Sequence, residues 1–335
     1  VTAPSTPRTE EAIVDELHAL AATRDVLLAE LREDRGAGDI TSHISVPPDT
    51  RARARLVGRA PGILAGLDGF ARAFELAAEH QLDGGEPGLA PVILNASDGD
   101  SVAPDQVLAS ITGNARALLW AERTALNLLQ HLSGIATLTA EFVRAAQSAG
   151  GAARVLDTRK TIPGLRHLEK YAVRCGGGSN HRFCLDDELL LKDNHLDLAG
   201  RSLGELLASA RSELGPGVRL VAEARSAEEA LAAAAGGADV VLLDNMTPAA
   251  MGELLPGLRA AGAASARRSE GHYPFEVEAS GGIDLTTIAA VAACGVDRIS
   301  VGALTHSAPA LDLSLYLEPL ESSGAADAHE SAEVS

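Results

Sequence analysis

The sequence has few aromatic residues, few cysteines and no long apolar segment. Aromatic residues make up 3% of the 335 residues, so the core must consist mainly of Ala, Leu and Val. The three cysteines are odd in number and form no CxxC pair, which argues against a disulfide framework or structural zinc and favours a reducing, cytoplasmic location. No apolar run approaches the roughly 20 residues that cross a bilayer, and the N-terminus lacks an export signal. We therefore expect no association with a membrane.

Lysine is also scarce, and its distribution is informative. The chain has three lysines among 28 basic residues, and all three lie between Asp157 and His195. This window is a basic island in a chain of formal net charge -18, which predicts an anionic ligand. The acidic balance elsewhere disfavours nucleic acid, because most of the surface would repel its phosphates. The cationic residues of the window are Arg159, Lys160, Arg166, His167, Lys170, Arg174, His181, Arg182 and Lys192.

The composition along the chain predicts two domains between two tails. Residues 1–10 and 321–335 have too little apolar surface to offset the entropy of ordering, so we expect both to be disordered. Residues 11–134 predict an N-terminal α+β sandwich, in which helix 115–132 leads to the next domain. Residues 311–320 form a C-terminal segment that returns toward the N-terminal domain. In the sandwich we expect strands at 54–58, 62–66, 91–96 and 107–112, with a helix at 69–80.

Residues 135–310 show a strand followed by a helix, repeated six times. The apolar runs are RVLDT, ELLLK, RLVAEA, VVLLD, FEVEAS and RISVG, and amphipathic helices separate them. This alternation predicts parallel strands covered by helices. Because no topological switch is apparent, the pattern favours an open, TIM-like α/β barrel of about six parallel strands over a doubly wound sheet.

Polar residues stand at the C-terminal end of every predicted strand, on the face that carries the active site of an α/β barrel. Arg, Lys and His side chains there suit carboxylates and phosphates. Glu223 and Asp244, on adjacent strands, are oxygen ligands suited to Mg²⁺. The turns at Gly281, Gly282 and Gly302 let backbone N–H groups approach a phosphate. The residues alone predict transfer of a phosphorylated sugar from a diphosphate to an acceptor that carries carboxylates.

The sequence resembles the quinolinate phosphoribosyltransferases at these residues. The resemblance covers nearly the whole chain except the tails, through EDRGAGDITS, ERTALNLLQHLSGIAT, DTRKTIPGLR, KYAVRCGGGSNHR, LLLKDNH, VLLDN, EASGGI and SVGALTHS. It implies an enzyme that converts quinolinate and phosphoribosyl pyrophosphate, with Mg²⁺, into nicotinate mononucleotide, pyrophosphate and CO₂ in NAD biosynthesis. It also implies a sandwich, an open barrel and a homodimer, with larger assemblies left open.

The resemblance also implies a role for each matching residue. Lys160, Glu223 and Asp244 would be catalytic, and the two carboxylates would be the Mg²⁺ ligands. Arg123, in ERTALN, would reach across the dimer interface into the neighbouring subunit's site. The other expected substrate-binding residues are Thr158, Arg159, His181, Arg182, Lys192, Ser280, Gly281, Gly282 and Gly302. The carboxylates of quinolinate would be bound by four of these residues, Arg159, His181, Arg182 and Lys192. Lys170, on the helix after PGLR, is expected to face solvent.

Three other interpretations remain open at the level of sequence. A Schiff-base lyase on an α/β barrel would use Lys160 or Lys192 as its nucleophile. An anion-binding module without catalysis would explain the cations but not the two carboxylates. Relatives of the family that are associated with molybdenum transport share many of the same motifs. Val221 and Arg225 stand where the family has acids, which concerns secondary metal contacts and leaves Glu223 in place.

Overall fold

The structure is a computed structural model that describes residues 10–80, 88–214, 217–266 and 273–320. These residues divide into two compact units. The first unit contains the described residues up to His131 and from Leu311 onward, and the second runs from Leu132 to Ala310. Apart from Glu10, both predicted tails lie outside the described residues. Within the described residues, no helix has the length and apolar character that a membrane span requires.

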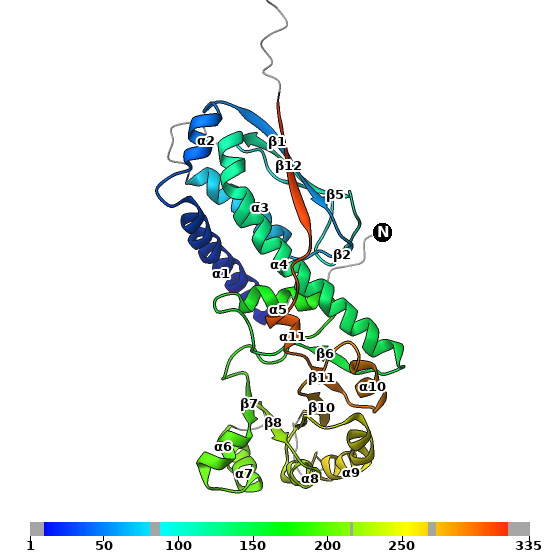
Figure 1. The fold of residues 1–335 in the computed structure, drawn as a ribbon. Coiled ribbons are helices and arrows are strands. Elements are labelled where there is room, and N and C mark those ends of the chain that lie inside the picture. Colours follow the sequence, from blue (N-terminus) through cyan, green and yellow to red (C-terminus); the bar gives the residue numbers. More distant parts are fainter. Residues whose placement is uncertain (1–9, 81–87, 215–216, 267–272, 321–335) are drawn as a thin grey trace, which may run out of the picture. The chain divides into compact units, whose positions relative to one another are not determined.

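The first unit contains antiparallel sheets and helices (Figure 1). The order of the main sheet is β12-β1-β5-β3, so the C-terminal strand pairs with the first strand of the unit. A smaller sheet pairs β2 with β4. The strands are β1 (Arg51–Gly58), β2 (Gly62–Ile63), β3 (Ile93–Leu94), β4 (Ser101–Val102), β5 (Val107–Asn114) and β12 (Leu313–Pro319), and the helices are α1 (Glu10–Arg35), α2 (Ile40–Ser45) and α3 (Leu67–Glu79).

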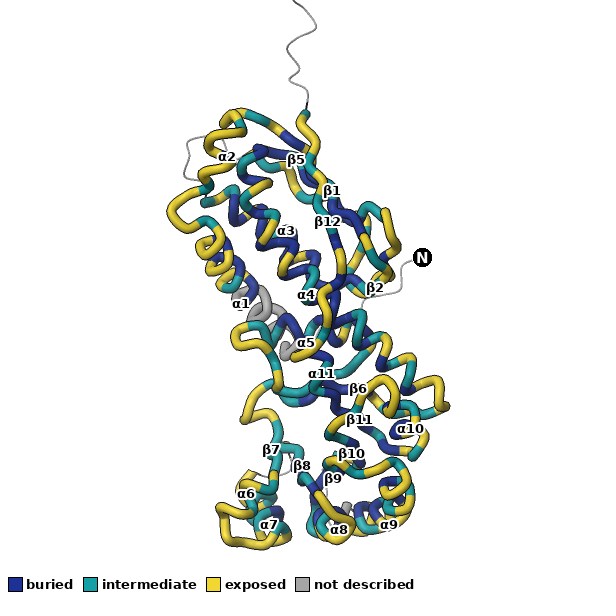
Figure 2. Tube along the Cα trace, in the orientation of Figure 1, coloured by how far each residue is buried: buried dark blue, intermediate teal, exposed yellow. Residues whose placement is uncertain are grey.

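The core of the first unit follows from simple periodicities. In β1 the sequence RARARL places Ala52, Ala54 and Leu56 on the buried face, and the intervening arginines are exposed or half-buried, as the two-residue period of a strand requires. Figure 2 colours the buried residues along the chain dark blue. In α3, Phe70 and Phe74 are fully buried and pack edge to face with ring centroids 5.1 Å apart. Few aromatic residues are therefore enough to fill this core.

Helix α4 (Ala115–Ser148) is longer than the sequence predicted. The prediction ended the helix at Leu132, which was wrong. Buried apolar residues continue at helical spacing through Ile135, Phe142 and Ala146, and no proline interrupts them, so nothing stops the helix at residue 132. The predicted boundary between residues 134 and 135 therefore falls inside one continuous helix.

The second unit contains a six-stranded parallel sheet of order β6-β11-β10-β9-β8-β7. Strands that follow one another in the sequence are neighbours in the sheet, except that the first strand, β6, pairs with the last, β11. This is the order of a barrel opened between β6 and β7, and it confirms the predicted open α/β barrel. The strands are β6 (Arg154–Leu156), β7 (Glu188–Leu191), β8 (Arg219–Ala224), β9 (Val240–Asp244), β10 (Glu276–Ser280) and β11 (Arg298–Ser300).

Seven helices of the second unit lie between or after these strands in the described residues, besides the end of α4. The unpaired edge of β6 is partly covered, because Ser179 forms a parallel bridge with Leu156. The segment after α5 therefore runs beside the end of β6. The helices are α5 (Arg166–Cys175), α6 (Asp193–Ala199), α7 (Leu203–Leu214), α8 (Ala227–Gly236), α9 (Pro248–Ala266), α10 (Ile288–Ala293) and α11 (Ala303–His306).

Candidate active site

The C-terminal ends of the parallel strands bring most of the predicted site residues to one edge of the sheet. Asp244 and Ser280 end β9 and β10, and the two residues are paired in register. Glu223 is the last residue but one of β8. Lys192 follows β7 directly, and Gly302 lies two residues beyond β11. The topology therefore places carboxylates, a cation and a glycine turn at the same edge.

Glu223 and Asp244 form a pair of neighbouring carboxylates. Burial raises the pKa of Glu223, Lys192 opposes that shift, and the charge of Asp244 raises the pKa further. Lys192 Nζ lies 3.7 Å from Glu223 Oε2, and Asn245 Nδ2 donates to Asp244 Oδ2 at 2.9 Å. The described residues contain no group of three side chains arranged as a metal cage. Two carboxylates fit Mg²⁺ nonetheless, since this ion commonly combines one or two carboxylates with water and substrate phosphates.

Arg159 and Arg182 form a concentration of positive charge. Burial lowers the pKa of Arg182, and the charge of Arg159 lowers it further, so the two guanidinium groups interact with each other. Arg182 donates to the carbonyl oxygen of Glu188 at 3.0 Å. Arg159 Nε is buried without a hydrogen-bond partner among the described residues. Two partly buried guanidinium groups held together are suited to an anion with more than one carboxylate.

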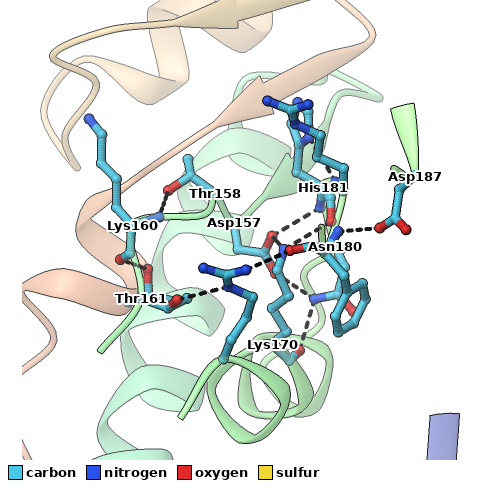
Figure 3. A network of polar contacts seen from close by, with 12 residues as sticks. Asp157, Thr158, Lys160, Thr161, Lys170, Asn180, His181 and Asp187 are labelled. Carbon is cyan, nitrogen blue, oxygen red and sulfur yellow. Dashed lines mark hydrogen bonds and ion pairs between the residues drawn. The ribbon is translucent and has the colours of Figure 1, made fainter. Parts of the chain in front are cut away.

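Lys160 is braced through its backbone, and its side chain is exposed. Its N–H donates to Thr158 Oγ1 at 3.0 Å, and its carbonyl oxygen accepts a hydrogen bond from Thr305 Oγ1 at 2.8 Å. A Cβ at Gly302 would lie 3.0 Å from Lys160 Cδ, so the glycine leaves space for the stem of the lysine. Figure 3 shows the Lys160 side chain extending away from the neighbouring polar network.

Gly281 permits a close backbone approach at the end of β10. Its φ of 90° lies in the region that favours glycine, and an added Cβ would lie 2.4 Å from Asn245 Oδ1. Because Asn245 also bonds Asp244, any larger residue at position 281 would disturb the surroundings of a predicted metal ligand. Gly282 follows with a φ of 60°. The predicted glycine turn therefore exists, and its phosphate-binding role stays a prediction.

The ring of His181 faces protein groups on both of its nitrogen atoms. Nδ1 accepts a hydrogen bond from the backbone N–H of Arg182 at 2.8 Å, and Nε2 lies 3.4 Å from Glu278 Oε1. Both ring nitrogens are therefore occupied by neighbouring protein groups. The residue is 8% exposed, and its predicted contact with substrate stays a prediction.

The sequence interpretation missed a charged network inside the barrel. Glu278 is fully buried and Arg298 is 1% exposed. The two form an ion pair in which Arg298 Nε lies 2.9 Å from Glu278 Oε2. The geometry of this contact does not meet the criteria of a hydrogen bond. Arg298 also lies 3.6 Å from Glu276 Oε2. The signal was present in FEVEAS, where glutamates alternate with apolar residues. Such alternation in a covered parallel strand indicates a polar inner face.

This network predicts how stability depends on pH. Although burial opposes the shift, contacts with His181 and Arg298 hold the pKa of Glu278 below its usual range. A depressed pKa in the folded state contributes stability that is present above the unfolded pKa, about 4.3, and is lost as the pH falls through the folded value. We expect Glu278→Gln to lower the free energy of unfolding by about 3 kcal/mol at pH 7, because Arg298 loses its partner. Urea unfolding measures this change.

The same substitution should also make the acid-induced loss of stability below about pH 4.3 less steep. The matched control is Glu253→Gln, at an exposed position on α9, which should leave both the stability and its pH profile unchanged. An acid profile of Glu278→Gln as steep as that of the unaltered protein would contradict the assignment.

Lys170 does not face solvent, so that prediction was wrong. Its side chain is fully buried and forms an ion pair with Asp157, which is also fully buried. Lys170 Nζ donates to the carbonyl oxygen of His181 at 2.9 Å and lies 4.9 Å from the centroid of the Phe183 ring. The error arose because the partner carboxylate is 13 positions away in the sequence, beyond the reach of helical periodicity.

Arg123 lies in the first unit, on α4, and its predicted role concerns a neighbouring subunit. The residue is exposed, whereas Ala121 and Thr124 on either side of the Glu122–Arg123 pair are buried. Burial raises the pKa of Glu122, and the charge of Arg123 opposes this shift. The structure thus places a cation at the surface of α4, and its partner stays a prediction.

An open parallel barrel with clustered cations and paired carboxylates at its C-terminal edge defines a barrel enzyme that acts on anionic substrates. The comparisons with known proteins are more specific. The family model described as "Quinolinate phosphoribosyl transferase, N-terminal domain" matches residues 39–133, and the corresponding C-terminal domain model matches residues 135–316. The chain belongs to the quinolinate phosphoribosyl transferase family.

Individual relatives agree with this family. The chain is 39% identical over 297 residues to the nicotinate-nucleotide pyrophosphorylase (carboxylating) of Mycobacterium leprae (strain TN), covering 88% of this chain and 97% of the relative. The solved structure of the nicotinate-nucleotide pyrophosphorylase from Francisella tularensis is 34% identical with a TM-score of 0.76, covering 89% and 96% of the two chains. The structure of NadC from Streptococcus pyogenes is 38% identical with a TM-score of 0.75, covering 95% and 100%.

Proposed function

We propose that this protein transfers the phosphoribosyl group of phosphoribosyl pyrophosphate to quinolinate with loss of CO₂, yielding nicotinate mononucleotide and pyrophosphate for NAD biosynthesis. The main support for the proposal is that, in a chain of this family, one edge of the barrel carries both a pair of cations and a pair of carboxylates. Arg159 and Arg182 provide two adjacent positive charges, and Glu223 and Asp244 provide paired carboxylates. The first pair suits a dicarboxylate, and the second suits a divalent ion with phosphates.

The residues of the site act mainly by positioning and by electrostatics. Arg159 and Arg182 hold the carboxylates and so orient the ring nitrogen toward C1 of the ribose. Lys160 places its charge beside the diphosphate that leaves as the new bond forms. Glu223 and Asp244 would hold Mg²⁺, which when bound neutralises charge on the diphosphate. Once the ring nitrogen is quaternised, the adjacent carboxylate leaves as CO₂. The electron pair of the broken C–C bond stays on the ring carbon, where the positive nitrogen beside it stabilises the charge, until that carbon takes up a proton from solvent.

A direct assay tests the function. Purified protein is incubated with quinolinate, phosphoribosyl pyrophosphate and Mg²⁺, and CO₂ and nicotinate mononucleotide are measured. We expect the two products in equal amounts, and none when either substrate is left out. Absence of nicotinate mononucleotide under these conditions would overturn the proposal and favour a relative of the family with a different reaction.

The geometry does not favour a Schiff-base lyase. A nucleophilic lysine needs a desolvated setting that favours the neutral amine. Lys160 is exposed, and the Lys192 side chain is 46% exposed and paired with Glu223. Lys170 is desolvated, but Asp157 and the carbonyl oxygen of His181 occupy its ammonium group. Borohydride should therefore trap no adduct with a carbonyl substrate.

We also propose a homodimer in which Arg123 of one subunit completes the site of the other. Its exposure on an otherwise buried stretch of α4 supports this arrangement. Mixing inactive Arg123→Ala and Lys160→Met subunits should then restore activity, because each mixed dimer has one site with both substitutions and one site with neither. With random mixing, about a quarter of the sites are intact, and activity per site measures that fraction. No recovery after confirmed subunit exchange would contradict the shared site.

The proposed location is the cytoplasm. Cys175, Cys184 and Cys294 are all free thiols, which supports a reducing compartment.

A further inference from the structure

Two loops at the open edge of the barrel carry five of the predicted site residues. The first site loop, residues 157–162, follows β6 and contains Thr158, Arg159 and Lys160. The second site loop, residues 179–183, precedes β7 and contains His181 and Arg182. The loops lie side by side, since the Asp157 N–H donates to the carbonyl oxygen of Ser179 at 3.2 Å. Helix α5 connects them in the sequence.

A buried ion pair joins α5 to both site loops (Figure 3). Lys170 Nζ contacts Asp157 of the first site loop and donates to the carbonyl oxygen of His181, in the second, at 2.9 Å. Asp157 Oδ1 accepts a hydrogen bond from the backbone N–H of His181 at 2.9 Å. Asn180 Nδ2 donates both to Asp157 and to the carbonyl oxygen of Lys170. Every polar atom of the Asp157 and Lys170 side chains is thus used to connect α5 with the two loops.

Two more side chains of α5, the partly buried Arg166 and the fully buried Glu169, also contact these loops. Arg166 Nε donates to Thr161 Oγ1 of the first site loop at 3.2 Å, and another nitrogen of the same guanidinium donates to the carbonyl oxygen of Phe183 in the second at 3.0 Å. Glu169 accepts a hydrogen bond from the backbone N–H of Ile162 at 3.2 Å. Arg166 therefore bridges the two loops directly, with the planar fork that lysine lacks.

The bridge opposes a repulsion between the loops. The charge of Arg159 in the first site loop lowers the pKa of Arg182 in the second, and Arg159 Nε has no hydrogen-bond partner among the described residues. Without a ligand these two charges push the loops apart. A bound dicarboxylate neutralises both charges and so removes the repulsion. If the loops first had to be brought together, however, the cost of doing so would weaken binding.

We propose that Asp157, Lys170 and Arg166 are positioning residues that hold the two site loops at a fixed spacing, so that Arg159 and Arg182 are preassembled for a dicarboxylate ligand. This inference rests on the proposed function for the identity of that ligand. Lys160 has a separate brace, because Thr305 and Gly302 support it from the β11 side. The bridge therefore governs the binding of quinolinate more than that of phosphoribosyl pyrophosphate.

The test is the substitution Arg166→Met, because Arg166 is only partly buried and its loss leaves the Asp157–Lys170 pair intact. We expect the KM for quinolinate to rise by about 10- to 100-fold, since misplacement of a binding group by about 1 Å has effects of this size. We expect kcat and the KM for phosphoribosyl pyrophosphate to change by less than about threefold. Arg166→Lys retains the charge but not the fork, and it should not restore the KM.

The matched control is Arg144→Met, because Arg144 is exposed on α4 and its side chain bonds its own helix. This variant should leave both KM values unchanged. Asp157→Asn combined with Lys170→Met removes both buried charges together and should reproduce the change in the KM for quinolinate. A folded Arg166→Met protein with an unchanged KM for quinolinate would overturn the proposal. A uniform loss of kcat with both KM values unchanged would also overturn it.

Hydrogen exchange measured without substrate tests this inference independently of the proposed function. The His181 N–H, which donates to Asp157, should exchange faster in Arg166→Met than in Arg144→Met, whatever reaction the protein catalyses. If the unaltered protein makes no nicotinate mononucleotide but exchange is still faster in Arg166→Met, the proposed function is wrong and the proposed bridge is supported. If the unaltered protein makes the nucleotide but exchange in Arg166→Met is unchanged, the proposed bridge is wrong and the proposed function is supported.

Discussion

Replacing Lys160 with methionine is expected to lower kcat by about 100- to 1,000-fold, the usual effect of removing one charge that stabilises a transition state. The fold should remain intact, because the contacts with Thr158 and Thr305 use the backbone atoms of residue 160. The substitution removes only the ammonium group that would face the diphosphate. Turnover at saturating substrate and the thermal unfolding midpoint measure the two effects.

Lys160→Arg is an informative companion to this variant. It restores a positive charge, but its larger head must fit beside Gly302, where the stem of the lysine packs closely. We therefore expect partial recovery of kcat. Near-normal turnover of the methionine variant would remove Lys160 from the mechanism.

Replacing Glu223 with glutamine is expected to lower turnover by about 100- to 1,000-fold and to raise the Mg²⁺ concentration needed for half-maximal activity. The amide is close in size to the carboxylate but lacks the charge that a hard cation prefers. Lys192 loses its ion pair in the same variant, so its proposed contact with quinolinate is expected to change as well. Turnover as a function of Mg²⁺ concentration, with and without a chelator, measures the change.

Glu228→Gln is the matched control, because it makes the same substitution on the helix that follows the same strand, at an exposed position. It should leave both turnover and the Mg²⁺ requirement unchanged. If Glu223→Gln shows the Mg²⁺ requirement of the unaltered protein, the two carboxylates do not hold the metal ion.

The barrel could be predicted because its signals are local. Each strand is a short apolar run followed by an amphipathic helix, and parallel strands joined by helices have few ways to pack. The end of α4 could not be placed from the same signals. The prediction ended the helix at Leu132, whereas the buried positions Ile135 and Phe142 continue it. A helix that spans two units has no local stop signal at their boundary.

The edge that carries the site was predictable for a related reason. In a parallel sheet all C-terminal ends lie at one edge, so the position of Glu223, Asp244 or Lys192 within its own strand is enough to place it there. Contacts between side chains were not predictable in the same way. The ion pair of Glu278 with Arg298 depends on which strands are neighbours and on which residues face inward. Both depend on the curvature of the sheet.

The sequence by itself determined the class of fold, the edge of the barrel at which the predicted site residues lie, and the family. These follow from periodicity, from strand ends and from long motifs, all of which can be read along the chain. Only the tertiary structure decided that Lys170 is buried against Asp157 rather than exposed, and that α5 thereby joins the two site loops. Burial and pairing depend on which segments pack together, and an isolated lysine on a helix gives no sign of a carboxylate that approaches it from a loop elsewhere in the chain.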